Sequence, residues 1–122
     1  RDAAAVLAVP DAIDFLHAHN WDAVRQRCHG LAAETRARIC ELTGLAPLSA
    51  DSPQWFGQMV AVPLPADIDA KALQERLYHD YKIEVPATAR NGHSYLRISF
   101  QGYNTRSDAD ALITALQDQF GL

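Results

Sequence analysis

Arg97 is the residue whose type and position most clearly suggest chemistry. It lies in the centre of segment 94–100, where apolar and polar residues alternate, and this alternation predicts a strand. Leu96, Ile98 and Phe100 would point to one face of that strand, and Arg97 would point to the other. A planar guanidinium can hold a carboxylate through two parallel hydrogen bonds if its face borders a cleft. The pattern also fits a solvated arginine or one paired with a nearby acid, so the residues alone leave three roles open.

The histidines and lysines add no recognisable catalytic or metal site. The five histidines lack the spacing of metal ligands, and His17 and His19, two residues apart, would face different sides of a helix. The only lysines are Lys71 and Lys82, and both are expected to extend into solvent rather than into a site for covalent catalysis. No glycine-rich phosphate-binding motif and no nucleophile-elbow motif occurs. We therefore assign no catalytic, cofactor-binding or metal-binding residue within the chain.

The two cysteines, Cys28 and Cys40, fall in one predicted helix. Their twelve-residue separation corresponds to about 18 Å along the helix axis. A disulfide requires Cα atoms within about 7 Å, so the two cannot bridge within a straight helix. We expect both to be small apolar helix residues in a reducing cytoplasm.

Length and charge exclude several classes of protein. The chain has 122 residues, of which 48% are hydrophobic and 21% charged, as is usual for one domain. Its formal net charge of -4 leaves no positive excess for binding phosphates, so nucleic acid is not an expected partner. Polar residues interrupt every apolar run, which predicts neither a membrane-spanning helix nor a signal peptide.

The N-terminal third of the sequence predicts two helices. The first covers 2–19 and should kink or break near Val9, because Pro10 lies within its apolar stripe. Asn20 is a candidate N-cap for the second helix, which would run from Trp21 until Gly44 ends it. A helix of more than twenty residues is long enough to cross from one domain to another.

The remaining sequence predicts alternating strands and helices. The nearly continuous apolar run at 56–64 predicts a strand that is covered on both faces and ended by prolines. After this strand, Asp67 and Asp69 lead into a predicted helix. A short strand is expected at 83–85, and Asn91-Gly92 is a strong hairpin signal before the Arg97 strand. The last helix should begin at a capping box formed by 105–108. This order predicts an α+β fold with a small, three-stranded, mostly antiparallel sheet covered by helices, preceded by a long helix.

Three segments carry a resemblance to a known family. The most specific motif is Arg-x-Ser followed by Tyr-Asn-Thr, at Arg97, Ser99 and 103–105, and the others are LAVPDAIDFL near the N-terminus and WFGQMVAVPLP at 55–65. Together they resemble the C-terminal part of the class V aminotransferase superfamily of pyridoxal-phosphate enzymes. The Trp-Phe-Gly-Gln-Met run favours its isopenicillin N epimerase-like branch. The resemblance covers nearly the whole chain.

The resemblance implies a fold-type-I enzyme whose small C-terminal domain closes over pyridoxal 5'-phosphate held by a large domain. Residues 1–19 would then be a helix continuing from that large domain, and 20–122 the small domain. The arginine matching Arg97 would bind the α-carboxylate of an amino-acid substrate. The lysine that carries the cofactor would precede Arg1, so this chain should be inactive alone. In full length we expect a cytoplasmic, homodimeric epimerase or aminotransferase.

Two alternatives remain at this point. A cysteine desulfurase or selenocysteine lyase would share the Arg-x-Ser motif, but it needs a cysteine on the loop before that strand, and 87–94 contains none. The other is a free-standing α+β regulatory module that binds a small anion at Arg97 and dimerises through Trp55 and Phe56. Arg90 and His93, beside the hairpin turn, either border a substrate-binding mouth or belong to an exposed turn.

Overall fold

The computed structural model describes residues 3–121. Within that range it has five helices and three strands. They are α1 (Ala4–Leu7), α2 (Val9–Ala18), α3 (Trp21–Thr43), β1 (Met59–Leu64), α4 (Ala70–Tyr81), β2 (Ala87–Arg90), β3 (His93–Ser99) and α5 (Arg106–Phe120). The sheet has the order β1-β3-β2, and both pairings are antiparallel. The predicted α+β fold with a three-stranded sheet is therefore confirmed.

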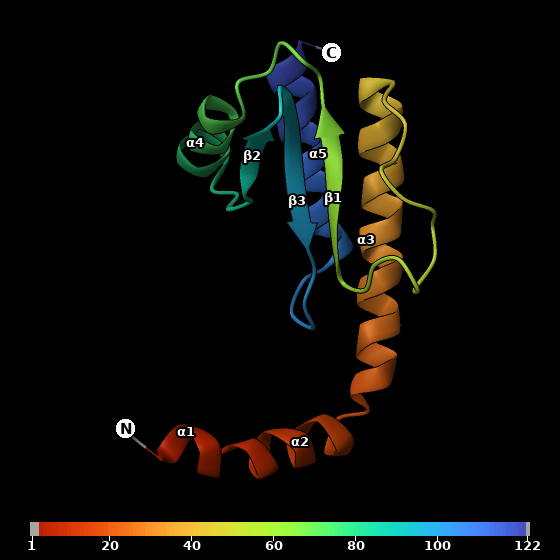
Figure 1. The fold of residues 1–122 in the computed structure, drawn as a ribbon, viewed down its shortest axis with the longest axis vertical. Coiled ribbons are helices and arrows are strands. Elements are labelled where there is room, and N and C mark those ends of the chain that lie inside the picture. The colour runs from red at the N-terminus through yellow and green to blue at the C-terminus, as the bar shows by residue number, and fades with distance from the viewer. Residues whose placement is uncertain (1–2, 122) are drawn as a thin grey trace.

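The first two helices extend away from the rest of the chain. As predicted, the helix is interrupted near Pro10, because α1 ends at Leu7 and α2 begins at Val9 with the proline in its first turn. Neither helix contains a buried residue. Figure 1 shows them leading away from the lower end of α3, below the sheet. Their exposed apolar residues are Val6, Leu7, Val9, Ile13 and Phe15.

Asn20 joins α2 to α3 in a different way from the one predicted. It occupies the N-cap position, but its backbone is left-handed, with φ 47° and ψ 54°, and its side chain makes no capping hydrogen bond. Its carbonyl instead accepts from the N–H of Ala23 at 3.1 Å. The abrupt change of direction between the helices requires a positive φ, which asparagine tolerates better than most residues. The residue therefore serves the backbone turn and not the cap.

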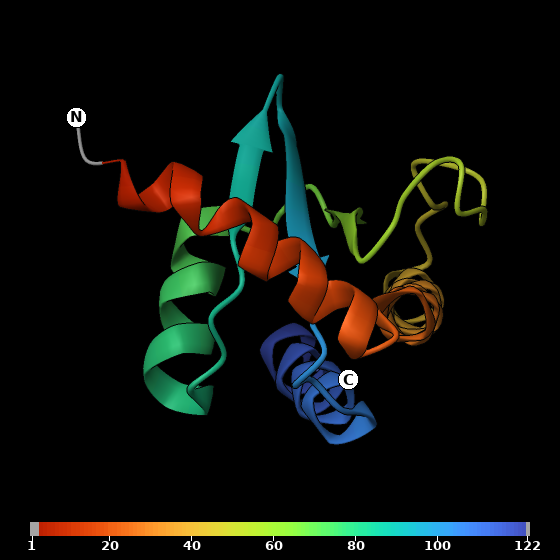
Figure 2. The same ribbon diagram turned by 90° about the horizontal axis from the view of Figure 1, so that it is seen from below.

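The helix α3 spans 23 residues and covers one side of β1. It ends at Gly44, whose φ of 69° confirms the predicted left-handed C-cap. Its buried residues recur at helical spacing and are Cys28, Ala32, Thr35, Arg36 and Ile39. This face joins α4 and α5 in forming the core against one face of the sheet, as the view from below in Figure 2 shows.

The strand β1 corrects the prediction that both of its faces are covered. Val60, Val62 and Leu64 are buried, whereas Met59 is 49% exposed and the intervening Ala61 is half-buried. Helices pack on the inner face of the sheet, but the described residues supply no layer over the outer face. The apolar run therefore identified the strand correctly but not the number of layers.

Pro63 lies within β1 rather than ending it, opposite Tyr95. The N–H of Arg97 donates to the carbonyl of Pro86 on the β2 side, at 2.9 Å. Since the N–H of Arg97 points toward β2, Arg97 and Ala61 form a non-hydrogen-bonded pair with respect to β1. Tyr95 lies two residues before Arg97, so its pair with Pro63 is of the same type. The nitrogen of Pro63 faces the open edge of the sheet, where a missing N–H removes no ladder hydrogen bond.

The predicted strand at 83–85 is wrong, and β2 lies after Pro86 instead. The helix α4 ends with Lys82 in the left-handed region, at φ 60°, and the N–H of Ile83 donates back to the carbonyl of Leu77 at 2.9 Å. This helix-end bond directs the chain away from β3, so 83–85 packs against the core without joining the ladder. The hairpin at 91–92 is confirmed, because Asn91 and Gly92 both have positive φ, 52° and 76°.

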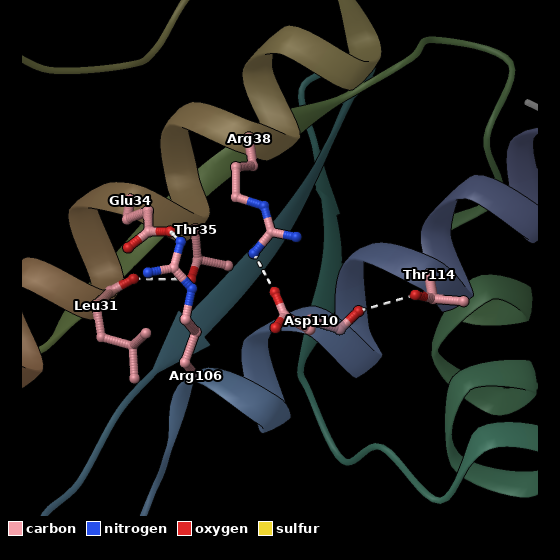
Figure 3. Close-up of polar contacts among 7 residues, drawn as sticks. All are labelled: Leu31, Glu34, Thr35, Arg38, Arg106, Asp110 and Thr114. Atoms are coloured by element: carbon pink, nitrogen blue, oxygen red, sulfur yellow. Dashed lines mark hydrogen bonds and ion pairs between the residues drawn. The ribbon is translucent and has the colours of Figure 1, made fainter.

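The helix α5 starts as predicted and is tied to α3. Its capping box is formed by Thr105 and Asp108. Figure 3 shows two arginine-carboxylate contacts between the helices: Arg38 Nη1 lies 2.5 Å from Asp110 Oδ1, and Arg106 pairs with Glu34. Beneath them, Leu112 and Leu116 enter the core. The sheet and its inner helices thus form one packed unit that leaves the outer sheet face open.

Candidate functional site

Arg97 lies in the middle of the open sheet face. It is exposed, as predicted from the alternation along β3, while its neighbours Leu96 and Ile98 are buried on the opposite face. Directly across the ladder on β1 stands Ala61. Because this pair is of the non-hydrogen-bonded type, the two Cα atoms are only about 4.5 Å apart. The single methyl group of Ala61 leaves space beside the arginine that a larger side chain would fill.

A hollow of about 430 Å³ lies over this part of the sheet. It is lined by residues of all three strands, of the segment before β2 and of the loop before β1. They are Leu48, Ala61, Pro86, Thr88, Arg90, Tyr95 and Arg97. The lining contains two arginines and no acidic residue. The hollow is therefore a cationic site with an apolar wall, which suits a carboxylate attached to a carbon skeleton.

The guanidinium of Arg97 has no intramolecular partner within residues 3–121. Five ion pairs are formed in that part of the chain, and neither Arg97 nor Arg90 takes part in any of them. By contrast, Arg36, Arg38 and Arg106 are each committed to an acid. The alternative in which an internal acid neutralises Arg97 is thus not observed among the described residues. Its donors remain available to a ligand.

Arg90 lines the same hollow as Arg97. The sequence alone had left open whether Arg90 borders a binding site or belongs to an exposed turn. It lies opposite His93 in the ladder, and Thr88 lies opposite Tyr95, so Arg90 shares the outer face with Arg97. His93 does not line the hollow, although its ring is 6.5 Å from that of Tyr95. The two-residue Asn91-Gly92 turn fixes this register, because it places Arg90 directly opposite His93. The sequence analysis did not place Arg90 beside Arg97, because it expected the preceding strand at 83–85 rather than at 87–90.

The loop before β1 supplies the apolar wall through Leu48, and α3 holds that loop in place. Arg36 is only 5% exposed, and its Nη1 donates to the carbonyl of Ser49 at 2.9 Å. Its guanidinium also lies 3.6 Å from Asp51 and 4.7 Å from the centre of the Phe56 ring. A cation over an aromatic face in a buried setting is attractive. Arg36 therefore holds the loop against α3 through contacts with Ser49, Asp51 and Phe56.

Phe56 and Trp55 have different environments. The ring of Phe56 is buried and lies 4.7 Å from the ring of His29, whose Nδ1 is 3.0 Å from the carbonyl of Gly57. Trp55 is 67% exposed. A dimer contact through Phe56, which the free-standing module would use, is therefore unavailable in this fold, whereas Trp55 remains accessible.

The residues of this chain do not fit a covalently held pyridoxal phosphate. Lys71 and Lys82 are both exposed, as expected; Lys82 Nζ donates to the carbonyl of His79 at 2.6 Å and Lys71 lies 3.9 Å from Glu75. Neither lies in the hollow. A lysine that carries the cofactor must reach a site screened from water, and these two do not.

The other motif residues and the cysteines have structural surroundings. Asn104 Oδ1 accepts from the N–H of Gln101 at 2.8 Å, and Thr105 caps α5, so the Tyr-Asn-Thr run forms a turn and a cap. Cys28 is buried on α3, and burial raises the pKa of the Cys40 thiol, which disfavours a reactive thiolate. No group of three metal-ligating side chains and no helix long and apolar enough to cross a membrane occurs in residues 3–121.

Known proteins are similar to this sequence over nearly its whole length. Over 118 residues, 97% of the chain, it is 37% identical to an isopenicillin N epimerase of Amycolatopsis lactamdurans. It is 34% identical over 116 residues to an isopenicillin N epimerase of Streptomyces clavuligerus. A putative L-cysteine desulfhydrase 1 of Oryza sativa subsp. japonica is 30% identical over 140 residues, 95% of the chain. The chain spans only about 30% of the length of these curated relatives. No protein-family model matches it.

Among solved structures, the fold is similar to that of 8-amino-7-oxononanoate synthase from Francisella tularensis, with a TM-score of 0.61. That similarity covers 90% of this chain and 32% of the synthase, at 22% identity, and so concerns the fold alone. The sequence relatives, in contrast, confirm the resemblance that the motifs had suggested. The chain is therefore a homologue of the isopenicillin N epimerases, related to the C-terminal part of the class V aminotransferase-like proteins.

Proposed function

We propose that this chain is the small C-terminal domain of a pyridoxal-phosphate-dependent epimerase or aminotransferase, and that Arg97 binds the α-carboxylate of its amino-acid substrate. The observation that carries the proposal is the unpaired guanidinium of Arg97 in an acid-free hollow on an uncovered sheet face. Homology to two isopenicillin N epimerases supports the class of enzyme. A share of about 30% of their length supports a role as one part of a larger protein.

In this proposal, a large domain of the same polypeptide holds the cofactor, because the lysines described here do not suit that task. The boundary between the two parts would fall near residue 19, where helices without buried residues lead into α3. The outer face of the sheet would border the active site. This chain alone would then be inactive, and the complete enzyme would be a homodimer. Its contribution is to bind and orient the substrate.

Arg97 would perform that contribution through its planar fork. Two parallel N–H···O bonds fix both the position and the rotation of a carboxylate, which a single point charge does not. Fixing the carboxylate orients the bonds at the adjacent α-carbon, and such orientation can supply a large part of a rate enhancement. The apolar wall formed by Leu48 and Ala61 would exclude water from the bound carboxylate.

The experiment is kinetic and uses the complete enzyme. Arg97→Ala should raise KM and lower kcat/KM by about tenfold to a hundredfold, because hydrogen bonds to a charged group contribute about 1.5–3 kcal/mol. The cofactor absorbance should stay unchanged. Arg76→Ala is the matched control, since Arg76 is an exposed arginine on α4 outside the hollow. Kinetics of Arg97→Ala equal to those of the control would remove the proposal.

A second activity is raised by the relatives named putative L-cysteine desulfhydrase. An enzyme that removes sulfide from cysteine would also use a carboxylate-binding arginine, so Arg97 does not distinguish the two. Incubation of the complete enzyme with L-cysteine separates them, because elimination releases sulfide, pyruvate and ammonia, whereas inversion at the α-carbon forms D-cysteine without releasing sulfide. A desulfurase with a nucleophilic cysteine is less favoured, since segment 87–94, now seen as the hairpin, contains no cysteine.

A further inference from the structure

The junction between α2 and α3, which we call the elbow (residues 15–21), carries three aromatic rings. The ring of Phe15 stacks on that of His19, with 4.0 Å between the centroids, and lies 5.9 Å from the ring of Trp21. The Nδ1 atom of His19 is also 2.8 Å from the carbonyl oxygen of Phe15. Because α2 has no buried residue, these contacts and the left-handed backbone of Asn20 set the angle between the two helices.

Trp21 also contacts the loop that follows β3, at Gly102. A Cβ atom on Gly102 would lie 3.3 Å from Trp21 Cη2 and 3.2 Å from Val24 Cγ1. Both distances are shorter than an ordinary contact between two carbon atoms, about 3.5–4.0 Å. Figure 1 shows the loop after β3 reaching down beside the lower part of α3. The absence of a side chain at Gly102 therefore permits an approach of the loop to α3 that a methyl group would push apart.

The loop after β3 is held to the sheet and to α3, so it moves with both. The N–H of Phe100 donates to the carbonyl of Gln58 at 2.9 Å, and Gln58 Nε2 donates to the carbonyl of Phe100 at 2.9 Å. From α3, Arg27 Nη2 donates to the carbonyl of Gly102 at 2.8 Å. A displacement of α3 at Gly102 is therefore passed to the end of β3, the strand that carries Arg97.

We propose that Trp21 is a positioning residue for Arg97: its ring joins the elbow to Gly102 and so fixes where the Arg97 strand lies relative to α2. The inference rests on the proposed function, in which α2 leads to the domain that holds the cofactor and Arg97 binds the substrate carboxylate. An arginine can orient the reacting carbon only if its own distance from the cofactor is constant. Trp21 does not line the hollow, so it would act through Arg97 and not on the substrate.

The test is kinetic and uses the complete enzyme, assayed below the melting temperature of each variant. Trp21→Ala should raise KM and lower kcat/KM by about tenfold, because a distant substitution that misplaces a substrate-binding group by about 1 Å can reduce the rate by up to about a hundredfold. The cofactor absorbance should stay unchanged. Tyr78→Ala is the matched control, since Tyr78 is an exposed aromatic residue on α4 outside the elbow and the hollow.

A pair of complementary substitutions tests the contact itself. Trp21→Phe removes the Cη2 atom and leaves a gap beside Gly102, whereas Gly102→Ala presses on the intact indole ring. Each single variant should raise KM. In the double variant the added methyl group occupies the space that Cη2 leaves, so its KM should be closer to that of the unchanged enzyme than either single value. Simple addition of the two effects would overturn the inference.

A second cycle shows whether Trp21 acts through Arg97. In an Arg97→Ala background, Trp21→Ala should have no further effect on kcat/KM. A Trp21 effect that persists in full in that background would mean a purely structural role and would overturn the inference, as would Trp21→Ala kinetics equal to those of Tyr78→Ala. Failure of the proposed function is seen separately, as an Arg97→Ala single variant with normal kinetics.

Discussion

Arg97 on β3 and Ala61 on β1 lie opposite each other in a non-hydrogen-bonded pair. Because the side chain of Ala61 is only a methyl group, it leaves open the hollow that Arg97 lines. The cationic site depends as much on this methyl group as on the guanidinium. Both residues lie on the sheet face that the described helices leave open, so changes there test binding without disturbing the core.

Ala61→Phe should block the hollow without unfolding the protein. A phenyl ring opposite Arg97 would occupy the space where a ligand must lie, so we expect carboxylate ligands to bind at least about tenfold more weakly. The melting temperature should change little, because the ring lies outside the core. Met59→Phe is the control: Met59 is on the same face of β1 but outside the hollow. If both variants bind ligand normally, the hollow is not the binding site.

Arg36→Met should loosen the loop that carries Leu48. The change removes the hydrogen bond to the Ser49 carbonyl and the contact with the Phe56 ring. We expect a loss of about 2 kcal/mol in the free energy of unfolding, measured in urea. Limited proteolysis should cut more rapidly within 45–58. Arg25→Met, which affects only an exposed pair with Asp22, should change neither measurement appreciably. Unaltered proteolysis of the Arg36 variant would show that other contacts hold the loop.

Stability should depend on the ionisation of Asp108 at the start of α5. A hydrogen bond from the Thr105 N–H, at 2.7 Å, and a second from its hydroxyl lower the pKa of this carboxyl. A carboxyl with a lowered pKa in the folded state stabilises above its unfolded pKa, about 4. That contribution is lost as the pH falls through the folded value.

Asp108→Ala should therefore destabilise the protein at neutral pH, and the difference from the unchanged protein should shrink below about pH 4. Free energies of unfolding in urea across that range provide the measurement. Thr105→Ala removes the hydroxyl donor but keeps the backbone donor, which is the larger cause of the shift. It should thus weaken the pH dependence without abolishing it. A difference between Asp108→Ala and the unchanged protein that stays constant with pH would contradict the assignment.

The Arg38–Asp110 contact between α3 and α5 should contribute little. Both side chains are partly exposed, so water and salt screen the attraction. A double-mutant cycle with Arg38→Ala and Asp110→Ala should give a coupling of about 0.2–1 kcal/mol that decreases at high salt. The neighbouring Arg106–Glu34 contact, also drawn in Figure 3, offers a second cycle for comparison. A coupling well above this range would mean that the two helices are held by charge rather than by their buried leucines.

The sequence by itself determined the elements whose signals are local. The turn at Asn91-Gly92, the C-cap at Gly44, the capping box of α5 and the alternation that turns Arg97 outward each depend on a few adjacent residues. Steric limits on φ and hydrogen bonds within one turn act over that short range, so the pattern was sufficient. The three motif segments together predicted the superfamily, the Trp-Phe-Gly-Gln-Met run predicted its isopenicillin N epimerase-like branch, and the relatives confirm this resemblance.

The tertiary structure decided what depends on competition between distant groups. Segment 83–85 has the pattern of a strand, but the end of α4 directs it away from β3. The apolar run of β1 could not reveal that the helices of residues 3–121 pack on only one face of the sheet. Arg90 and Leu48 joined the hollow only once strand register and the anchoring by Arg36 had brought them beside Arg97. Strand pairing, the number of layers and the burial of each residue depend on the relative free energies of contacts between distant parts of the chain. A local sequence pattern does not contain those free energies.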